Sequence, residues 1–219
     1  MRDSFVHLNV HSEYSIADGT IRIPQLIERC KKHNFSTVAI TDLNNLFAAI
    51  KFNREAKKAG IKPIIGAEVT IIAADKDTSN YSSIFLCRNE GGYKNLCDIL
   101  TICQKGESGQ IGIPESVLFS RKCDGIIILS GDQDSDIGQA ILKRNFAQAK
   151  ARVHQWENLT NGNFFCQISK LNKPNELQYL NGLAQLSETV PIRPVATNQA
   201  RFLEKRDFVV HEARVCIQQ

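Results

Sequence analysis

The fold and the candidate site of this protein both depend on residues 7–19, HLNVHSEYSIADG. Residues 5–10 have the apolar and β-branched content of a short strand, and alternation along it places His7, Asn9 and His11 on one face. Two histidines and the acid Asp18 around a strand end are typical of a metal site. However, Asn9 stands where such a site needs a further histidine, and a neutral amide oxygen is a weak ligand. The stretch therefore predicts either a working metal site or one that has lost ligands.

The composition is typical of a globular protein. The chain has 219 residues, is 42% hydrophobic and carries a formal charge of +4, with basic residues scattered in the way expected of solvated helix faces. No run of about 18 apolar residues occurs, and the N-terminus lacks the apolar core of a signal peptide, so we expect neither a membrane span nor secretion. The seven cysteines form no C-x-x-C pair, which favours buried free thiols in a reducing cytoplasm.

Strand and helix patterns alternate along the chain. We predict strands at residues 5–10, 37–41, 62–72, 82–89, 125–131, 164–169 and 192–198, and helices at residues 24–34, 45–60, 91–103, 136–145, 146–159, 174–188 and 205–218. Repeated βα units imply a mostly parallel sheet, and this number of units suggests a closed barrel. No interior linker stands out, so one domain over residues 1–219 is expected. In such barrels the chemistry lies at the C-terminal ends of the strands.

Several motifs in register carry a family resemblance. They are HLNVHSEYSIADG, AITDLNNLFAAIKFNREAKKAGIKPIIGAEV, GGYKNL, GIIILSG, VATNQARF and DFVVHEARVCI. In this order and at these distances they resemble the N-terminal PHP (polymerase and histidinol phosphatase) domain of bacterial replicative DNA polymerase III alpha subunits. The resemblance covers residues 5 to 219 and implies a distorted (β/α)7 barrel. In members with complete sites, nine ligands hold up to three metal ions, commonly zinc or manganese.

The family's ligand pattern can be laid on this chain position by position. The resemblance implies three retained ligand positions, which are His11, Asp18 and Glu68. At six other positions the expected ligand is replaced, by Asn9, Leu43, Ser83, Asp132, Gln199 and Arg201. Three retained ligands cannot complete even two metal sites, since each site needs about three or four. We therefore expect no resident metal or cofactor and no catalytic residue in this domain.

Arg201 has a physical consequence beyond a missing ligand, because arginine is a permanent cation. Acids left without their metals repel one another and need another cation. We predict that the Arg201 guanidinium replaces the metal charge by pairing with Asp18, Glu68 or Asp132. An alternative left open by the sequence is that a hard ion such as Mg²⁺ visits these three acids with several waters.

The resemblance also implies a parent function and partners. A longer parent chain would be a DNA-directed DNA polymerase, a cytoplasmic nucleotidyltransferase of DNA replication whose polymerase domain uses Mg²⁺ and binds most of the DNA. This domain would be a non-catalytic scaffold that braces the thumb and palm, docks the proofreading exonuclease subunit and joins other replicase subunits. One alternative is a residual metal-dependent phosphoesterase or 3′–5′ exonuclease in the barrel. A second is a free-standing regulatory protein with no polymerase attached.

Overall fold

A computed structural model describes residues 5–16, 18–106 and 110–218, with the side chain of Gln218 excluded. The chain divides into two compact units. Unit 1 comprises residues 1–68 and 197–219, and unit 2 comprises residues 69–196. The strand β3 (Lys62–Ile72) begins in unit 1 and ends in unit 2.

Unit 1 contains the parallel strand pairs that position the candidate site. Its other elements are β1 (Asn9–Val10), the 3-10 helix η1 (Glu13–Ser15), α1 (Ile23–Lys32), β2 (Thr37–Leu43), α2 (Ala49–Lys58), β9 (Gln199–Ala200), the 3-10 helix η2 (Lys205–Asp207) and α8 (Phe208–Gln218). β2 pairs with β3 in parallel, from Thr37 opposite Lys62 to Leu43 opposite Glu68. β1 pairs with β9 in parallel, with Asn9 opposite Gln199.

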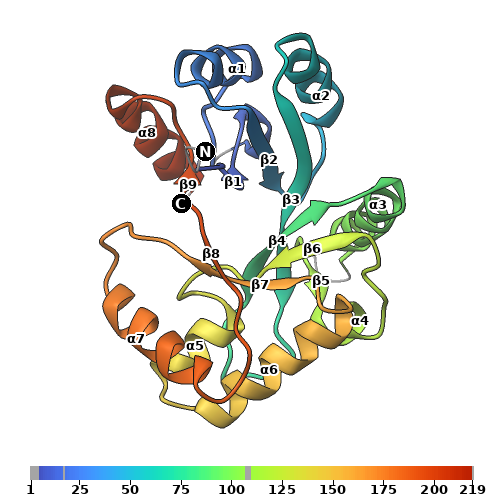
Figure 1. The fold of residues 1–219 in the computed structure, drawn as a ribbon, viewed down its shortest axis with the longest axis vertical. Coiled ribbons are helices and arrows are strands. Elements are labelled where there is room, and N and C mark those ends of the chain that lie inside the picture. Colours follow the sequence, from blue (N-terminus) through green and yellow to red (C-terminus); the bar gives the residue numbers. More distant parts are fainter. Residues whose placement is uncertain (1–4, 17, 107–109, 219) are drawn as a thin grey trace. The chain divides into compact units, whose positions relative to one another are not determined.

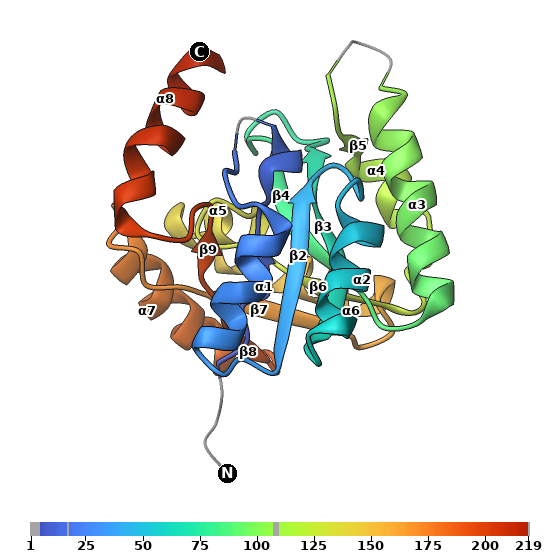
Figure 2. The same ribbon diagram turned by 90° about the horizontal axis from the view of Figure 1, so that it is seen from above.

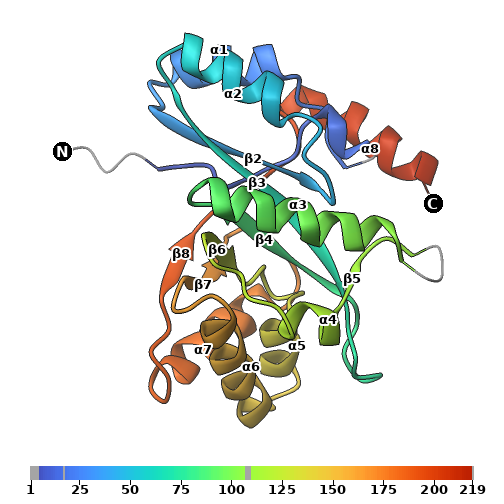
Figure 3. The ribbon, with the colours of Figure 1, turned by 90° about the vertical axis from the view of Figure 1, so that its right-hand side faces the viewer.

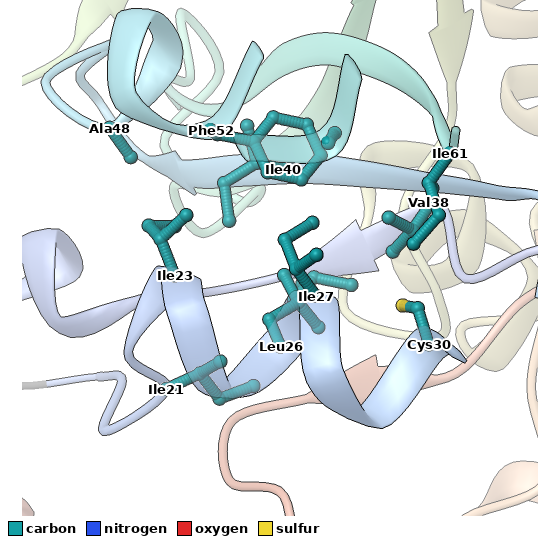
Figure 4. Packing of buried hydrophobic residues seen from close by; sticks show 12 residues of the cluster. Ile21, Ile23, Leu26, Ile27, Cys30, Val38, Ile40, Ala48, Phe52 and Ile61 are labelled. Carbon is teal, nitrogen blue, oxygen red and sulfur yellow. The ribbon is translucent and has the colours of Figure 1, made fainter. Parts of the chain in front are cut away.

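The core of unit 1 is formed by two helices and the strand between them. In α1 the buried residues Ile23, Leu26, Ile27 and Cys30 recur at the spacing of one helix face. Together with Val38 and Ile40 of β2, and Phe52 and Ala56 of α2, they form one apolar cluster (Figure 4). α1 and α2 lie side by side (Figures 1 and 2). This burial holds β2 and its pairing with β3 in place beneath the site.

Unit 2 continues the sheet, and one of its strands, β4, runs antiparallel to its neighbour β6. Its elements are the end of β3, β4 (Tyr81–Cys87), α3 (Glu90–Gln104), β5 (Ile113–Pro114), α4 (Glu115–Phe119), β6 (Ile126–Leu129), α5 (Asp136–Leu142), α6 (Phe146–Leu159), β7 (Phe164–Ile168), α7 (Glu176–Ser187) and β8 (Pro194–Ala196). The strand order is β3-β4-β6-β7-β8, with β5 beside β3. β4 is antiparallel to β6, whereas β6, β7 and β8 run parallel. Figure 3 shows α5, α6 and α7 gathered together in this unit.

The predicted α/β class is confirmed, and the differences are the antiparallel strand β4, a few short elements and the ends of longer ones. The strand predicted at residues 5–10 is assigned only as β1, although the His7 carbonyl still accepts a hydrogen bond from Ala39 N at 2.9 Å. The helix predicted from residue 45 begins at Ala49, because the Asn45 side chain forms a turn by accepting a hydrogen bond from Phe47 N. The short elements α4, β5 and β9 were not predicted, since two to five residues carry little periodic signal.

All seven cysteines are free, as predicted, and their burial varies. Four of them are buried, which are Cys30, Cys103, Cys123 and Cys166. Cys87 and Cys97 are half-buried, and Cys216 on α8 is exposed. The expectation of buried thiols is therefore wrong for Cys216, because the face of α8 that carries it is turned to solvent.

Candidate functional site

Four strands bring the retained and replaced positions of unit 1 together. His11 follows β1, Leu43 ends β2, Glu68 lies in β3 opposite Leu43, and Arg201 follows β9. β1 is tied to β9 by a hydrogen bond from His11 N to Ala200 O of 2.9 Å, and to β2 by one from Val10 N to Thr41 Oγ1 of 2.9 Å. β1 pairs with β9, and β2 with β3, in parallel. The site therefore lies at the C-terminal ends of β1, β2 and β9, where the sequence predicted it, with Glu68 four residues before the end of β3.

Arg201 lies at the centre of a charged cluster. Its Nε is 2.8 Å from Asp18 Oδ2, and its second terminal nitrogen is 3.3 Å from Glu68 Oε2. The guanidinium is largely buried, with the side chain 12% exposed. The backbone carbonyl of Arg201 accepts a hydrogen bond from Thr20 N at 3.0 Å, which holds the residue against the loop that carries Asp18. The predicted pairing of Arg201 with the acids is confirmed for Asp18 and Glu68.

His11 completes the cluster between the same two carboxylates. Its ring is fully buried, with Nδ1 2.8 Å from Asp18 Oδ2 and Nε2 2.9 Å from Glu68 Oε2. Burial opposes the imidazolium form, but hydrogen bonds to Asp18 and Glu68 and the charge of Glu68 outweigh it and raise the pKa of His11. For Asp18, burial also acts against ionisation, yet the His11 hydrogen bond and the Arg201 charge lower its pKa. With His11 protonated, two cations balance two carboxylates.

Asn9 takes part in this cluster. Its Oδ1 accepts a hydrogen bond of 2.9 Å from the other terminal nitrogen of Arg201, and the residue is buried. Asn9 is therefore a partner suited to a guanidinium, whose five N–H groups need several acceptors. Leu43 contributes no ligand atom from its side chain, and Gln199 lies opposite Asn9 in the strand register.

Asp42 has a role that the sequence reading missed. Its buried carboxylate accepts hydrogen bonds from Ser12 N at 2.6 Å, from the Ser12 hydroxyl at 2.8 and 3.0 Å, and from the Ser15 hydroxyl at 2.7 Å. It thereby holds Ser12 and Ser15, which follow β1, in place. Gly19 packs so closely that a Cβ there would lie 2.2 Å from Ser12 O. The two serines three residues apart are the signal that could have indicated an acceptor between them.

The remaining two candidate positions lie in unit 2. Ser83 of β4 is fully buried and donates a hydrogen bond of 3.2 Å to Ser130 O. Asp132 accepts a hydrogen bond from the Ser169 hydroxyl. Burial raises the pKa of Asp132, although this hydrogen bond and the charge of Lys173 oppose the shift. Both side chains thus have partners within unit 2.

The comparisons with known proteins agree with the resemblance. Residues 7–170 match the family model of the PHP domain. This chain belongs to the PHP domain family. It is 35% identical over 218 residues to the DNA polymerase III subunit alpha of Pseudomonas fluorescens, which covers 99% of this chain and 19% of that relative. It is 32% identical over 214 residues to the subunit of the same name from Escherichia coli K12, covering 97% of this chain and 18% of that relative. The chain thus spans about a fifth of these relatives, in their N-terminal region.

Solved structures support the PHP-like fold at low identity. A protein described as a metal-dependent phosphoesterase from Bifidobacterium adolescentis aligns with a TM-score of 0.57 at 12% identity, covering 95% of this chain and 96% of that one. An amidohydrolase from Chromobacterium violaceum aligns with a TM-score of 0.55, also at 12% identity, over 96% of this chain and 97% of that one. Such identities bear on the fold alone. Among the described residues, no helix combines the length and apolar character that a membrane span requires.

The side chains of this PHP domain do not fit the metals that the family implies. In unit 1 both nitrogens of His11 lie against Asp18 and Glu68, and the same two carboxylates contact the Arg201 cation. A dication placed among them would meet a guanidinium at contact distance, which is repulsive. Within residues 5–16, 18–106 and 110–218, no group of three or more His, Cys, Asp or Glu side chains is arranged to hold a metal ion. The arrangement is suited to internal charge pairing.

Proposed function

We propose that residues 1–219 are the N-terminal PHP domain of a bacterial replicative DNA polymerase III alpha subunit. The parent chain synthesises DNA from a template with Mg²⁺ in its polymerase domain, in the cytoplasm. The PHP domain is a non-catalytic scaffold. It braces the thumb and palm of the parent chain and docks the proofreading exonuclease subunit, while DNA is bound mainly by the rest of the polymerase.

One observation supports the scaffold role above others, namely the Arg201 guanidinium between Asp18 and Glu68. A hydrolytic PHP site needs metal ions to polarise the phosphoester and to supply a hydroxide at neutral pH. Here a protein cation lies in contact with both retained carboxylates. The cluster also joins Glu68, within β3, to His11 and Arg201, which follow β1 and β9, so its energy contributes to holding these three strands together.

The test of the parent activity uses the full-length chain. With a primed template, deoxynucleotides and Mg²⁺, we expect template-directed primer extension, and its absence would refute the polymerase assignment. Docking is measured by size-exclusion chromatography of the parent chain with the purified exonuclease subunit. We expect co-elution, and we expect the 219-residue chain to compete for the subunit. Failure to compete would refute docking through this domain.

A second candidate is a residual metal-dependent phosphoesterase or 3′–5′ exonuclease. It is favoured by the close approach of His11, Asp18 and Glu68, whose facing atoms lie 2.8 to 2.9 Å apart. Elemental analysis of the 219-residue chain, with phosphatase and exonuclease assays in Mn²⁺ or Zn²⁺, separates the two functions. The scaffold role predicts substoichiometric metal and no turnover. Stoichiometric metal with turnover abolished by Asp18→Asn would establish the second candidate instead.

A further inference from the structure

The helix α8 carries an apolar face that is turned to solvent. At 100° per residue, the side chains of Cys216, Val209, Ala213, Ile217 and Val210 follow one another around about 120° of its circumference. All five are exposed, with Val209 at 68% and Ile217 at 84%. A stripe of this width is what a surface helix normally buries against a core. We call these five residues the α8 stripe.

The opposite side of α8 already packs within unit 1. The His211 ring lies 5.7 Å from the Phe202 ring, and Phe208 contacts the same ring edge-on at 5.9 Å. Arg214 donates a hydrogen bond to the Gly19 carbonyl. The helix is thus attached to its own unit by one side, and the α8 stripe is a second apolar face. In Figure 2, α8 stands apart from α1 and α2.

A groove adjoins the stripe. It has a volume of about 440 Å³ and lies between α1 and the segment formed by η2 and α8, with Ile21, Leu203 and Val210 among its apolar lining. Val210 belongs to both the groove and the stripe. Charged side chains of both signs also line it, namely Arg29, Lys32 and Arg206 together with Glu28, Glu204 and Asp207. Apolar side chains next to charged ones are typical of protein-binding sites.

We propose that the α8 stripe and this groove dock a segment of the parent chain that follows residue 219. This inference rests on the proposed function, because it requires a longer parent chain. The relatives named DNA polymerase III subunit alpha support it, since they align over only 18–19% of their length, in their N-terminal region. The large remainder of such a chain follows α8 directly in sequence.

The size of the stripe favours this occupant over a second copy of the chain. At 1.5 Å per residue, an 11-residue helix presents a face roughly 16 Å long and about 10 Å wide. A stable dimer buries about 800 Å² on each partner, several times the area of that face. A segment tethered in the same polypeptide has a high effective concentration, so a small apolar face is sufficient to hold it.

Cys216 is a native probe of this docking, because its thiol belongs to the stripe and is exposed in the 219-residue chain. The rate of its alkylation by N-ethylmaleimide is measured by peptide mass mapping in the parent chain and in the 219-residue chain. We expect alkylation to be about tenfold slower or more in the parent chain, as for a face covered about 90% of the time. Equal rates in the two chains would overturn the proposal.

Two variants of the parent chain make the test specific. Val209→Glu combined with Ile217→Glu places charges on the stripe and should restore the rate of the 219-residue chain to within about twofold. Leu177→Glu, at a comparably exposed position in unit 2 (71%), should leave Cys216 protected. The same double substitution in the 219-residue chain should leave its thermal unfolding midpoint unchanged, since both side chains are exposed there.

Two further outcomes are decisive. Protection of Cys216 in the 219-residue chain that increases with its concentration would show a dimer face and refute intramolecular docking. Primer extension by the same parent preparation reports the proposed function separately. A parent chain that extends primers but alkylates Cys216 rapidly would refute only the docking, whereas one that extends none would refute the polymerase assignment.

Discussion

Replacing Arg201 with leucine removes the cation between two carboxylates and should destabilise the domain. Glu68 is only 15% exposed, and removing one partner of a buried ion pair costs about 3–5 kcal/mol. We take the lower end because His11 still contacts Glu68. Asp18 is 37% exposed and therefore screened by solvent, so its pair with Arg201 adds at most about 1 kcal/mol. The loss of about 3–4 kcal/mol corresponds to a fall in Tm of about 6–16 °C for a chain of this length.

The measurement is thermal unfolding of the 219-residue chain at neutral pH, followed by circular dichroism or calorimetry. Arg206→Leu is the matched control, because that side chain is 87% exposed and its nearest acidic atom, on Asp207, lies 4.0 Å away. We expect its Tm to change by less than about 1 °C, as for an exposed pair. If Arg201→Leu also shifts Tm by less than about 2 °C, the guanidinium does not carry the charge balance of the cluster.

Two further predictions concern titration. The imidazole of His11 should titrate above 6.5 in an NMR experiment, and Asp18→Asn should lower that pKa, since a hydrogen bond to Asp18 raises it. The stability that a raised pKa contributes is complete below the pKa of the unfolded chain and is lost as pH rises through the pKa of the folded protein. A titration of His11 at or below 6.5 would contradict the predicted rise in its pKa. The fluorescence of Trp156, whose indole donates a 3.0 Å hydrogen bond to Asp136, should change near pH 6, because burial raises the pKa of Asp136 to about 6. Folding then favours protonated Asp136, so the stability that this protonation contributes is lost as pH rises through about 6. The fluorescence change should vanish in Asp136→Asn.

Much of the fold could be predicted because it follows from periodic local patterns. The α1 residues Leu26, Ile27 and Cys30 recur at helical spacing, and in the structure they are buried together with residues of β2, as that spacing predicts. β2 and β3 are continuous β-rich runs that could be located within a few residues. The two-residue strand β9 could not be predicted, because Gln199 and Ala200 become a strand only by pairing with β1. The reversed direction of β4 was not predicted either. The short connection of residues 73–80 could have indicated it, because parallel neighbours need a longer crossover.

The candidate site divides in the same way. The prediction that Asn9, Leu43 and Arg201 are lost ligand positions needed both the family resemblance, which implies where ligands stand, and the residue types, which fix the donor atoms of each side chain. The sequence likewise indicated that the acids would need a cation. Which acids Arg201 contacts was decided by the tertiary structure, since Asp18 and Glu68 are far from it along the chain.

The sequence by itself determined the order of most helices and strands, because that order follows from local periodicity, and it determined the residue types at the positions where the family resemblance implies ligands. Only the tertiary structure decided that Asn9 accepts from Arg201, that Asp42 holds the loop of Ser12 and Ser15, and that one face of α8 is left in solvent. These features arise from long-range strand pairing and from the packing of one helix side. Neither is expressed in any short stretch of residues.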